Sequence, residues 1–210
     1  MSYVMGCWSD DGENATIYIS KNYEQPLLSA LQNFKNKVPL TKEEEYMLKV
    51  IWHELNHLRT KDIFKFYKQL SDTERYLLET INDFITLHTY DKFLKMLSPN
   101  AKPYYQKEFI KEAFGGYQTY VKRFRYVLQK FKINEKEAVK ELESILFEDG
   151  ENLWRRLRYW LMTKTDLTEI QSGVIINDIV NQLMSDEEFQ KEVDEYYEIS
   201  KRRKKRRLSS

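Results

Sequence analysis

The spacing of apolar side chains predicts that most of this chain is helical. Apolar residues recur three and four positions apart, which places them on one face of an α-helix. Residues 15–20, ATIYIS, differ because apolar and polar side chains alternate there, and this pattern is typical of a short strand. We therefore predict a mainly α (α+β) fold with a small N-terminal β element and with helices over residues 23–37, 42–59, 72–97, 104–132, 135–147, 151–163, 167–184 and 186–200.

Capping boxes mark the starts of two of these helices. In a capping box, a hydroxyl side chain and a glutamate three residues later satisfy the first backbone amides of the helix. Thr41 with Glu44 predicts a helix that begins at about residue 42. Ser71 with Glu74 predicts a second one that begins at about residue 72.

The first of these helices contains the sequence His-Glu-Leu-Asn-His at residues 53–57, the H-E-x-x-H pattern. His53 and His57 lie one turn apart on the same helical face, so their imidazoles can hold one zinc ion. A helical wheel separates both histidines and Glu54 from the apolar face of Leu48, Ile51, Trp52, Leu55 and Leu58. The motif uses two of the three histidines in the chain. It predicts a zinc site that hydrolyses peptide bonds, with Glu54 as the base for a metal-activated water.

A catalytic zinc ion needs a third protein ligand, and the helix over 72–97 offers three candidates. Glu79 begins an E-x-x-x-D pair with Asp83, one turn later on the same helix. On a helical wheel Glu79 lies opposite the apolar face, whereas His88 lies on the face of Leu77, Ile81, Phe84 and Ile85. Glu74 is a further candidate that already has a role in the capping box. We rank Glu79 first, His88 second and Glu74 third.

The segment HELNHLRTKDI resembles the active-site segment of gluzincin-type metallopeptidases, especially the group related to the HtpX protease. In that group an aspartate follows the second histidine by five positions, as Asp62 does here, and a later E-x-x-x-D completes the site. The resemblance implies a zincin-like helical domain. It also implies zinc ligands at His53, His57 and Glu79, a base at Glu54, and a partner for a ligand histidine at Asp83.

Those relatives typically span membranes, whereas this chain has no apolar run near the roughly 18 residues that a span requires. The order of a strand, a helix and the motif helix also resembles small zincins of phages and mobile elements. The N-terminus does not have the pattern of a signal peptide, and the single cysteine, Cys7, fits a reducing compartment. We therefore expect a soluble, intracellular (cytoplasmic) protein.

The sequence FGGYQTY, residues 114–120, is a candidate source of a donor for the oxyanion formed during hydrolysis. Gly115 and Gly116 are expected to interrupt the helix over 104–132, which would let Tyr117 or Tyr120 project toward a cleft. The alternative is that both side chains pack in the core. With 15 tyrosines in the chain, core packing is the commoner role.

The charge of the chain is distributed unevenly. The formal net charge is +1, yet residues 201–207, KRRKKRR, are all basic, so the rest of the chain is acidic. We predict one domain over residues 1–200 and a basic, disordered tail over 201–210. Such a tail is expected to stay solvated or to bind nucleic acid, an acidic partner or a membrane surface through Lys201–Arg207.

These observations lead to a first hypothesis and two alternatives. The first is a zinc-dependent metallopeptidase that acts on a peptide or protein. The second is a catalytically silent zincin-fold protein of a phage or mobile-element assembly, tethered to nucleic acid by its basic tail. The third is a nucleic-acid-associated protein with a structural zinc. The presence of Glu54 favours the first, because a structural site needs no base beside its ligands.

Overall fold

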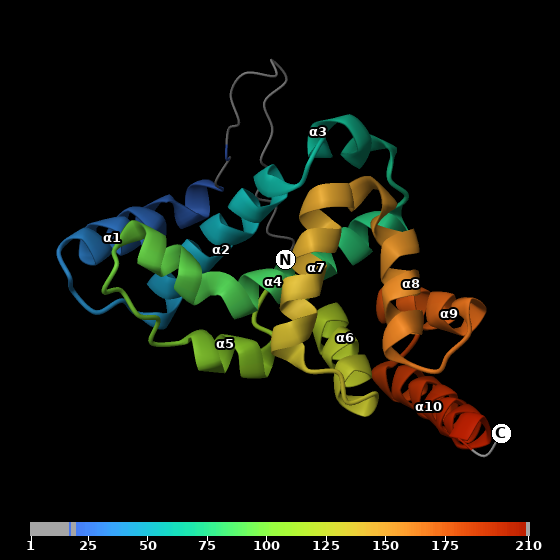
Figure 1. The fold of residues 1–210 in the computed structure, drawn as a ribbon. Helices are drawn as coiled ribbons and strands as arrows, with labels where there is room; N and C mark the ends of the chain where they lie inside the picture. The colour runs from blue at the N-terminus through green and yellow to red at the C-terminus, as the bar shows by residue number, and fades with distance from the viewer. Residues whose placement is uncertain (1–16, 18–19, 209–210) are drawn as a thin grey trace.

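The computed structural model describes residue 17 and residues 20–208, and this part of the chain is mainly helical, as predicted (Figure 1). Three short 3-10 turns at Lys21–Tyr23, Tyr67–Gln69 and Gly150–Asn152 accompany the α-helices. The strand predicted over 15–20 lies largely outside the described residues. The α-helices are α1 (Glu24–Lys35), α2 (Lys42–Arg59), α3 (Ile63–Phe66), α4 (Asp72–Leu97), α5 (Gln106–Glu112), α6 (Gln118–Lys130), α7 (Glu135–Asp149), α8 (Leu153–Lys164), α9 (Glu169–Ile179) and α10 (Asp186–Leu208).

Both predicted capping boxes are present and set the starts of α2 and α4. The Glu44 amide donates to the Thr41 hydroxyl, and the Glu44 carboxylate accepts from the Thr41 amide. Ser71 and Glu74 make the same reciprocal pair at the start of α4. Each box satisfies amides that would otherwise have no partner in the first turn. The helix predicted over 104–132 is broken around Gly115 and Gly116 into α5 and α6, as expected.

The helix predicted over 167–184 ends earlier, at Ile179, because the next residues form a turn around a buried arginine. Arg123 of α6 donates to the backbone carbonyls of Asp178, Asn181 and Met184. Its Nε also lies 2.7 Å from Asp186 Oδ1 at the start of α10. These bonds satisfy carbonyl groups at the end of α9 and fix the turn between the last two helices.

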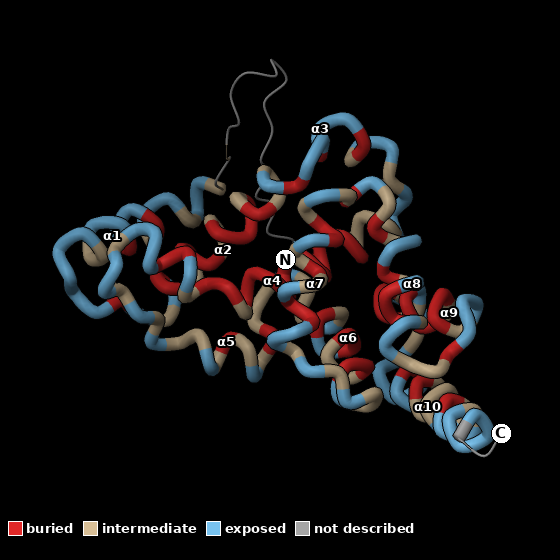
Figure 2. The backbone as a smooth tube through the Cα atoms, viewed as in Figure 1, coloured by how far each residue is buried: buried red, intermediate tan, exposed pale blue. Residues whose placement is uncertain are grey.

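Helix α4 passes through the centre of the molecule, between two groups of helices. Its N-terminal half contributes Leu77, Ile81 and Phe84 to a large core shared mainly with α6, α7, α8 and α9. Its C-terminal half contributes Tyr90 and Phe93 to a smaller core shared with α1 and α2. Every residue from 77 to 87 is buried, and Figure 2 shows buried stretches along α4 and its neighbour α2. Helix α4 therefore has no solvent-exposed face in its middle.

The disordered tail expected from residue 201 is instead helical as far as Leu208, where α10 ends. Two of its basic side chains hold the helix against the body of the protein. Arg203 donates to Gln171 Oε1 at 2.8 Å, and Arg207 pairs with Asp166 Oδ1 at 2.9 Å. Positive charge at the C-terminal end of a helix also complements the helix dipole. These two effects explain why a run of like charges remains helical here.

Membrane-crossing helices are absent from the part of the chain that the structure describes. None of the helices there combines the length and the apolar character that crossing a membrane would require.

Candidate metal centre

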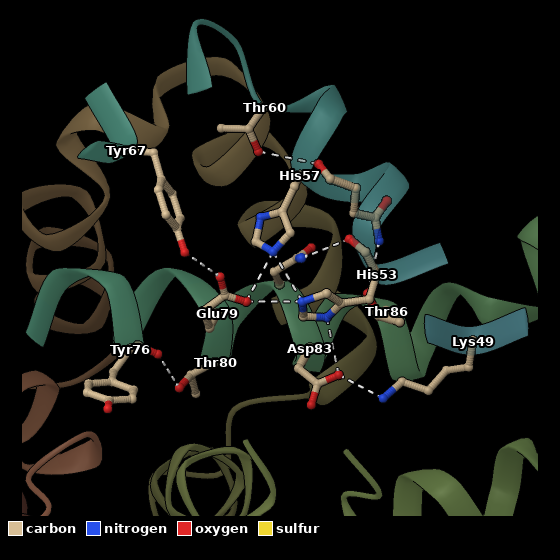
Figure 3. Close-up of polar contacts among 12 residues, drawn as sticks. Lys49, His53, His57, Thr60, Tyr67, Tyr76, Glu79, Thr80, Asp83 and Thr86 are labelled. Carbon is tan, nitrogen blue, oxygen red and sulfur yellow. Dashed lines mark hydrogen bonds and ion pairs between the residues drawn. The ribbon is translucent and has the colours of Figure 1, made fainter. Parts of the chain in front are cut away.

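Helices α2 and α4 pack against each other and bring His53, His57 and Glu79 together (Figure 3). The Nε2 atoms of His53 and His57 lie 3.1 Å apart, and each lies 3.0 Å from Glu79 Oε2. The three atoms thus form a nearly equilateral triangle. His53 and Glu79 are buried, and His57 is only slightly more exposed. These three side chains can hold a metal ion.

The triangle has the dimensions of one face of a small metal coordination shell. Zinc binds imidazole nitrogen and carboxylate oxygen at about 2.0–2.2 Å, so neighbouring ligand atoms of a tetrahedral site lie about 3.3 Å apart. The observed separations of 3.0–3.1 Å are close to this value. Two imidazole nitrogens and one carboxylate oxygen also form a donor set that suits zinc. The residues therefore fit such an ion, with a fourth position left for another ligand.

The structure places the three candidates for the third ligand differently. Glu79 points at the histidines, because α2 covers the face of α4 that lies opposite the large core. His88 does not join them, since its Nε2 lies 3.1 Å from Glu135 Oε2 of α7 and its ring packs on Phe84. Glu74 caps the start of α4. The prediction of His88 as a ligand is therefore wrong, because its position on the apolar face turns it toward α7.

A buried carboxylate supports the first ligand histidine. His53 Nδ1 lies 3.4 Å from Asp83 Oδ1, and the same oxygen accepts from Lys49 Nζ at 2.8 Å. Asn82 Nδ2 donates to the backbone carbonyl of His53 at 3.0 Å. A carboxylate on the second ring nitrogen of a metal-binding histidine orients the ring and increases its basicity. Asp83 is thus the carboxylate that the structure brings beside His53.

Two further residues of the site were not identified from the sequence. Lys49 lies one turn before His53 and also donates to the Phe114 carbonyl at 2.9 Å. Tyr67, in the turn after α3, donates its hydroxyl to Glu79 Oε1 at 3.1 Å, which leaves Oε2 directed at the histidines. The spacing of Lys49 from His53 was a usable signal, since residues i and i+4 share a helical face. Nothing in the pattern around Tyr67 pointed to the site.

The charges of the site stabilise one another. Burial alone would lower the pKa of His53, but the carboxylates of Asp83 and Glu79 outweigh it and raise this pKa to about 10. Burial would raise the pKa of Glu79, yet the two histidines hold it well below its ordinary range. In the same way Lys49 and His53 overcome burial and hold the pKa of Asp83 at about 2. The site therefore keeps both carboxylates ionised.

Glu54 follows His53 on α2 and is buried beside the ligands. Burial raises the pKa of its carboxyl above the ordinary value, while the nearby His53 and His57 act in the opposite direction. A carboxylate whose pKa is raised toward neutrality is a better proton acceptor than an exposed one. A buried carboxylate beside the two histidines is thus available as a proton acceptor.

Of the two tyrosines proposed as oxyanion donors, Tyr117 lies beside the metal ligands. Its ring is nearly parallel to that of His53, with 6.5 Å between the ring centroids and an interplanar angle of 9°. Burial and the charge of Glu79 raise the pKa of its hydroxyl, which therefore stays protonated and able to donate. Tyr120 instead packs against Tyr76, with ring centroids 5.6 Å apart. The geometry favours Tyr117 over Tyr120.

Gly115 is required by the close approach of the loop before α6 to the Asp83–Lys49 pair. A Cβ atom on Gly115 would lie 2.3 Å from Asp83 Oδ2 and 2.9 Å from Lys49 Nζ, whereas one on Gly116 would meet nothing within 4 Å. Gly115→Ala is therefore expected to lower the free energy of unfolding by about 1–3 kcal/mol, the usual cost of overpacking. Urea denaturation measures this loss.

The neighbouring glycine provides a matched control for this prediction. Gly116→Ala makes the same chemical change in open space, so it is expected to leave stability unchanged or to raise it by up to about 1 kcal/mol. Equal losses in the two variants would show that the close contact at Gly115 has no special energetic role.

Comparison with known proteins returns no relative for this chain. No protein-family model, no curated protein and no solved structure matches it. The function must therefore be argued from the chemistry and the geometry of the site formed by α2 and α4.

Proposed function

We propose that this protein is a zinc-dependent metallopeptidase in which His53, His57 and Glu79 hold the ion and Glu54 is the general base. The observation that carries the proposal is the convergence of three ligand atoms within 3.0–3.1 Å of one another, with Glu54 directly beside them in the sequence. The Asp83 carboxylate contacts His53, and the Tyr67 hydroxyl donates to Glu79. Neighbouring residues therefore hold two of the three proposed ligands in place.

The number of ligands favours a catalytic rather than a structural site. Structural zinc sites are usually closed by four protein ligands, whereas catalytic sites use three and leave a position for water or substrate. Within the described residues the cluster consists of three side chains. An adjacent buried glutamate also has no purpose in a structural site, and this supports a hydrolytic role over the structural alternatives.

Each residue has a defined task in this proposal. A zinc ion bound here would supply Lewis acidity toward water and toward a peptide carbonyl. Glu54 accepts a proton on its carboxylate and later delivers it to the leaving amine. Tyr117 keeps its hydroxyl proton and donates to developing negative charge. Asp83 and Tyr67 fix the orientations of His53 and Glu79.

The test is metal analysis combined with a peptidase assay on the full chain. We expect about one zinc per chain, and cleavage of a denatured protein substrate that stops with a chelator and returns with zinc. Loss of a residue that only supports a ligand lowers metal affinity by up to about 100-fold. Glu79→Gln removes the charge of a proposed ligand itself, so zinc affinity is expected to fall by more than this. Isothermal titration or competition with a chromogenic chelator measures this affinity.

His88→Gln is the matched control, because His88 lies on the same helix but contacts Glu135 instead of the histidines. It is expected to keep full zinc occupancy. A folded wild-type protein that binds no metal would refute the proposal, and so would equal zinc affinity in the wild type and Glu79→Gln. Zinc binding without any hydrolysis would instead support the catalytically silent alternative.

A further inference from the structure

The last two turns of α10 carry seven consecutive basic residues, and this end of the helix lies outside the packed body of the protein. The first half of α10 is held by the core, where Phe189 and Val193 are buried, and by the bond from Tyr126 to Asp194. Residues 201–207 are exposed except for the half-buried Arg203. Figure 1 shows this end of α10 at the far side of the molecule from α1, and Figure 2 shows it as exposed.

The basic side chains are not distributed at random around the helix. At about 100° per residue, Arg203 and Arg207 project in nearly the same direction. This is the side that faces the body, where they bond to Gln171 and Asp166. The remaining basic residues spread over an arc of about 200° that is centred on the opposite side. They are Lys201, Arg202, Lys204, Lys205 and Arg206.

This arrangement fits a groove lined by phosphates better than a flat acidic surface. A flat partner can reach only part of a 200° arc, whereas the two backbones of a B-form DNA duplex lie on both sides of a helix in the major groove. A membrane surface is a poorer partner, because helices that lie on membranes insert apolar side chains, and residues 201–207 contain none. The two docked arginines also hold the helix in place before binding, which reduces the entropic cost of association.

We propose that the C-terminal end of α10 binds duplex DNA through backbone phosphates. Residues 202 and 204–206 form the contact, with Lys201, which pairs with Glu198, at its edge. Arg203 and Arg207 hold the helix on the protein. Binding of this kind is independent of base sequence and sensitive to salt. The site is separate from His53, His57 and Glu79, so the inference does not depend on the proposed peptidase activity.

The experiment is fluorescence anisotropy of the full chain with a labelled 24-base-pair DNA duplex, at 50 and 200 mM salt. With four to five phosphates contacted, affinity is expected to fall about 150- to 500-fold between these salt concentrations. The variant Arg202→Gln/Lys204→Gln/Lys205→Gln/Arg206→Gln removes four of the charges and keeps residues of good helix propensity. It is expected to bind at least tenfold more weakly at 50 mM salt.

A matched control removes four charges elsewhere. Lys35→Gln/Lys107→Gln/Lys111→Gln/Lys140→Gln replaces exposed lysines on α1, α5 and α7 and makes the same change in net charge. It is expected to bind like the wild type. Equal weakening in both variants would overturn the proposal, because net charge alone would then explain binding. Tighter binding to phosphatidylserine vesicles or to polyglutamate than to the duplex would overturn it as well.

Discussion

Replacing Glu54 with glutamine is expected to stop peptide hydrolysis while zinc stays bound at full stoichiometry. Glutamine has nearly the same shape and leaves His53, His57 and Glu79 unchanged, but it cannot accept a proton. Loss of a general acid–base residue costs about 10²–10⁴-fold in rate, and kcat/KM is expected to fall within or beyond this range. The measurements are kcat/KM on a fluorogenic peptide and zinc content by atomic emission.

Glu43→Gln is the control for this substitution. It makes the same chemical change on the same helix, but Glu43 is exposed in the first turn of α2, far along the helix from the ligands. Activity is expected to be unchanged. If Glu54→Gln hydrolysed the peptide as fast as the wild type, Glu54 could not be the base. If the variant lost its zinc as well, its inactivity would have to be attributed to damage at the metal centre.

Most of the helices and the first two members of the His53, His57 and Glu79 cluster could be predicted from the sequence, because both depend on local spacing. The capping boxes set the starts of α2 and α4, and the i, i+4 geometry of His53 and His57 is a property of any helix. The wheel also separated the apolar face of α2 from its ligand face. Such features need no knowledge of which helices pack together.

The position of Glu79 is harder to predict because the middle of α4, residues 77–87, is buried on all sides. A helical wheel assigns polar residues to solvent, yet the polar face of α4 packs against α2. Hydrogen bonds make this burial possible, as between Asn56 and Thr86 and between Trp52 and Thr89. When the polar faces of two helices pack together, a helical wheel predicts that both faces are exposed to solvent. His88 was a false candidate for the same reason. The wheel did not show that the apolar face of α4, which carries His88, packs toward α7 and not toward α2.

The contacts of Lys49 and Tyr67 depend on tertiary packing. Lys49 meets Asp83 of α4 and the Phe114 carbonyl of the loop before α6, which are distant in sequence. Tyr67 reaches Glu79 only because the turn after α3 folds back over α4. The spacing within α2 places Lys49 on the same face as His53, but it does not show which groups of other elements either Lys49 or Tyr67 contacts.

Lys49→Met is expected to be the most destabilising of the substitutions considered for this site. The side chains of Lys49 and Asp83 are almost fully buried, and their charged atoms lie 2.8 Å apart. Methionine keeps much of the length of lysine but leaves the Asp83 charge without its cation and the Phe114 carbonyl without its donor. Breaking a buried ion pair in this way costs about 3–5 kcal/mol. Urea denaturation in the presence of a chelator measures the loss without a contribution from metal binding.

Two further variants separate the ion pair from general effects of losing a lysine. Lys95→Met removes the partner of Asp91 in an exposed pair on α4, where the expected loss is below about 1 kcal/mol. Adding Asp83→Asn to Lys49→Met removes the stranded charge, so the double variant is expected to be more stable than Lys49→Met alone. If Lys49→Met and Lys95→Met lost the same stability, the buried pair would not be what holds α2, α4 and the Phe114–Gly116 segment together around the ligands.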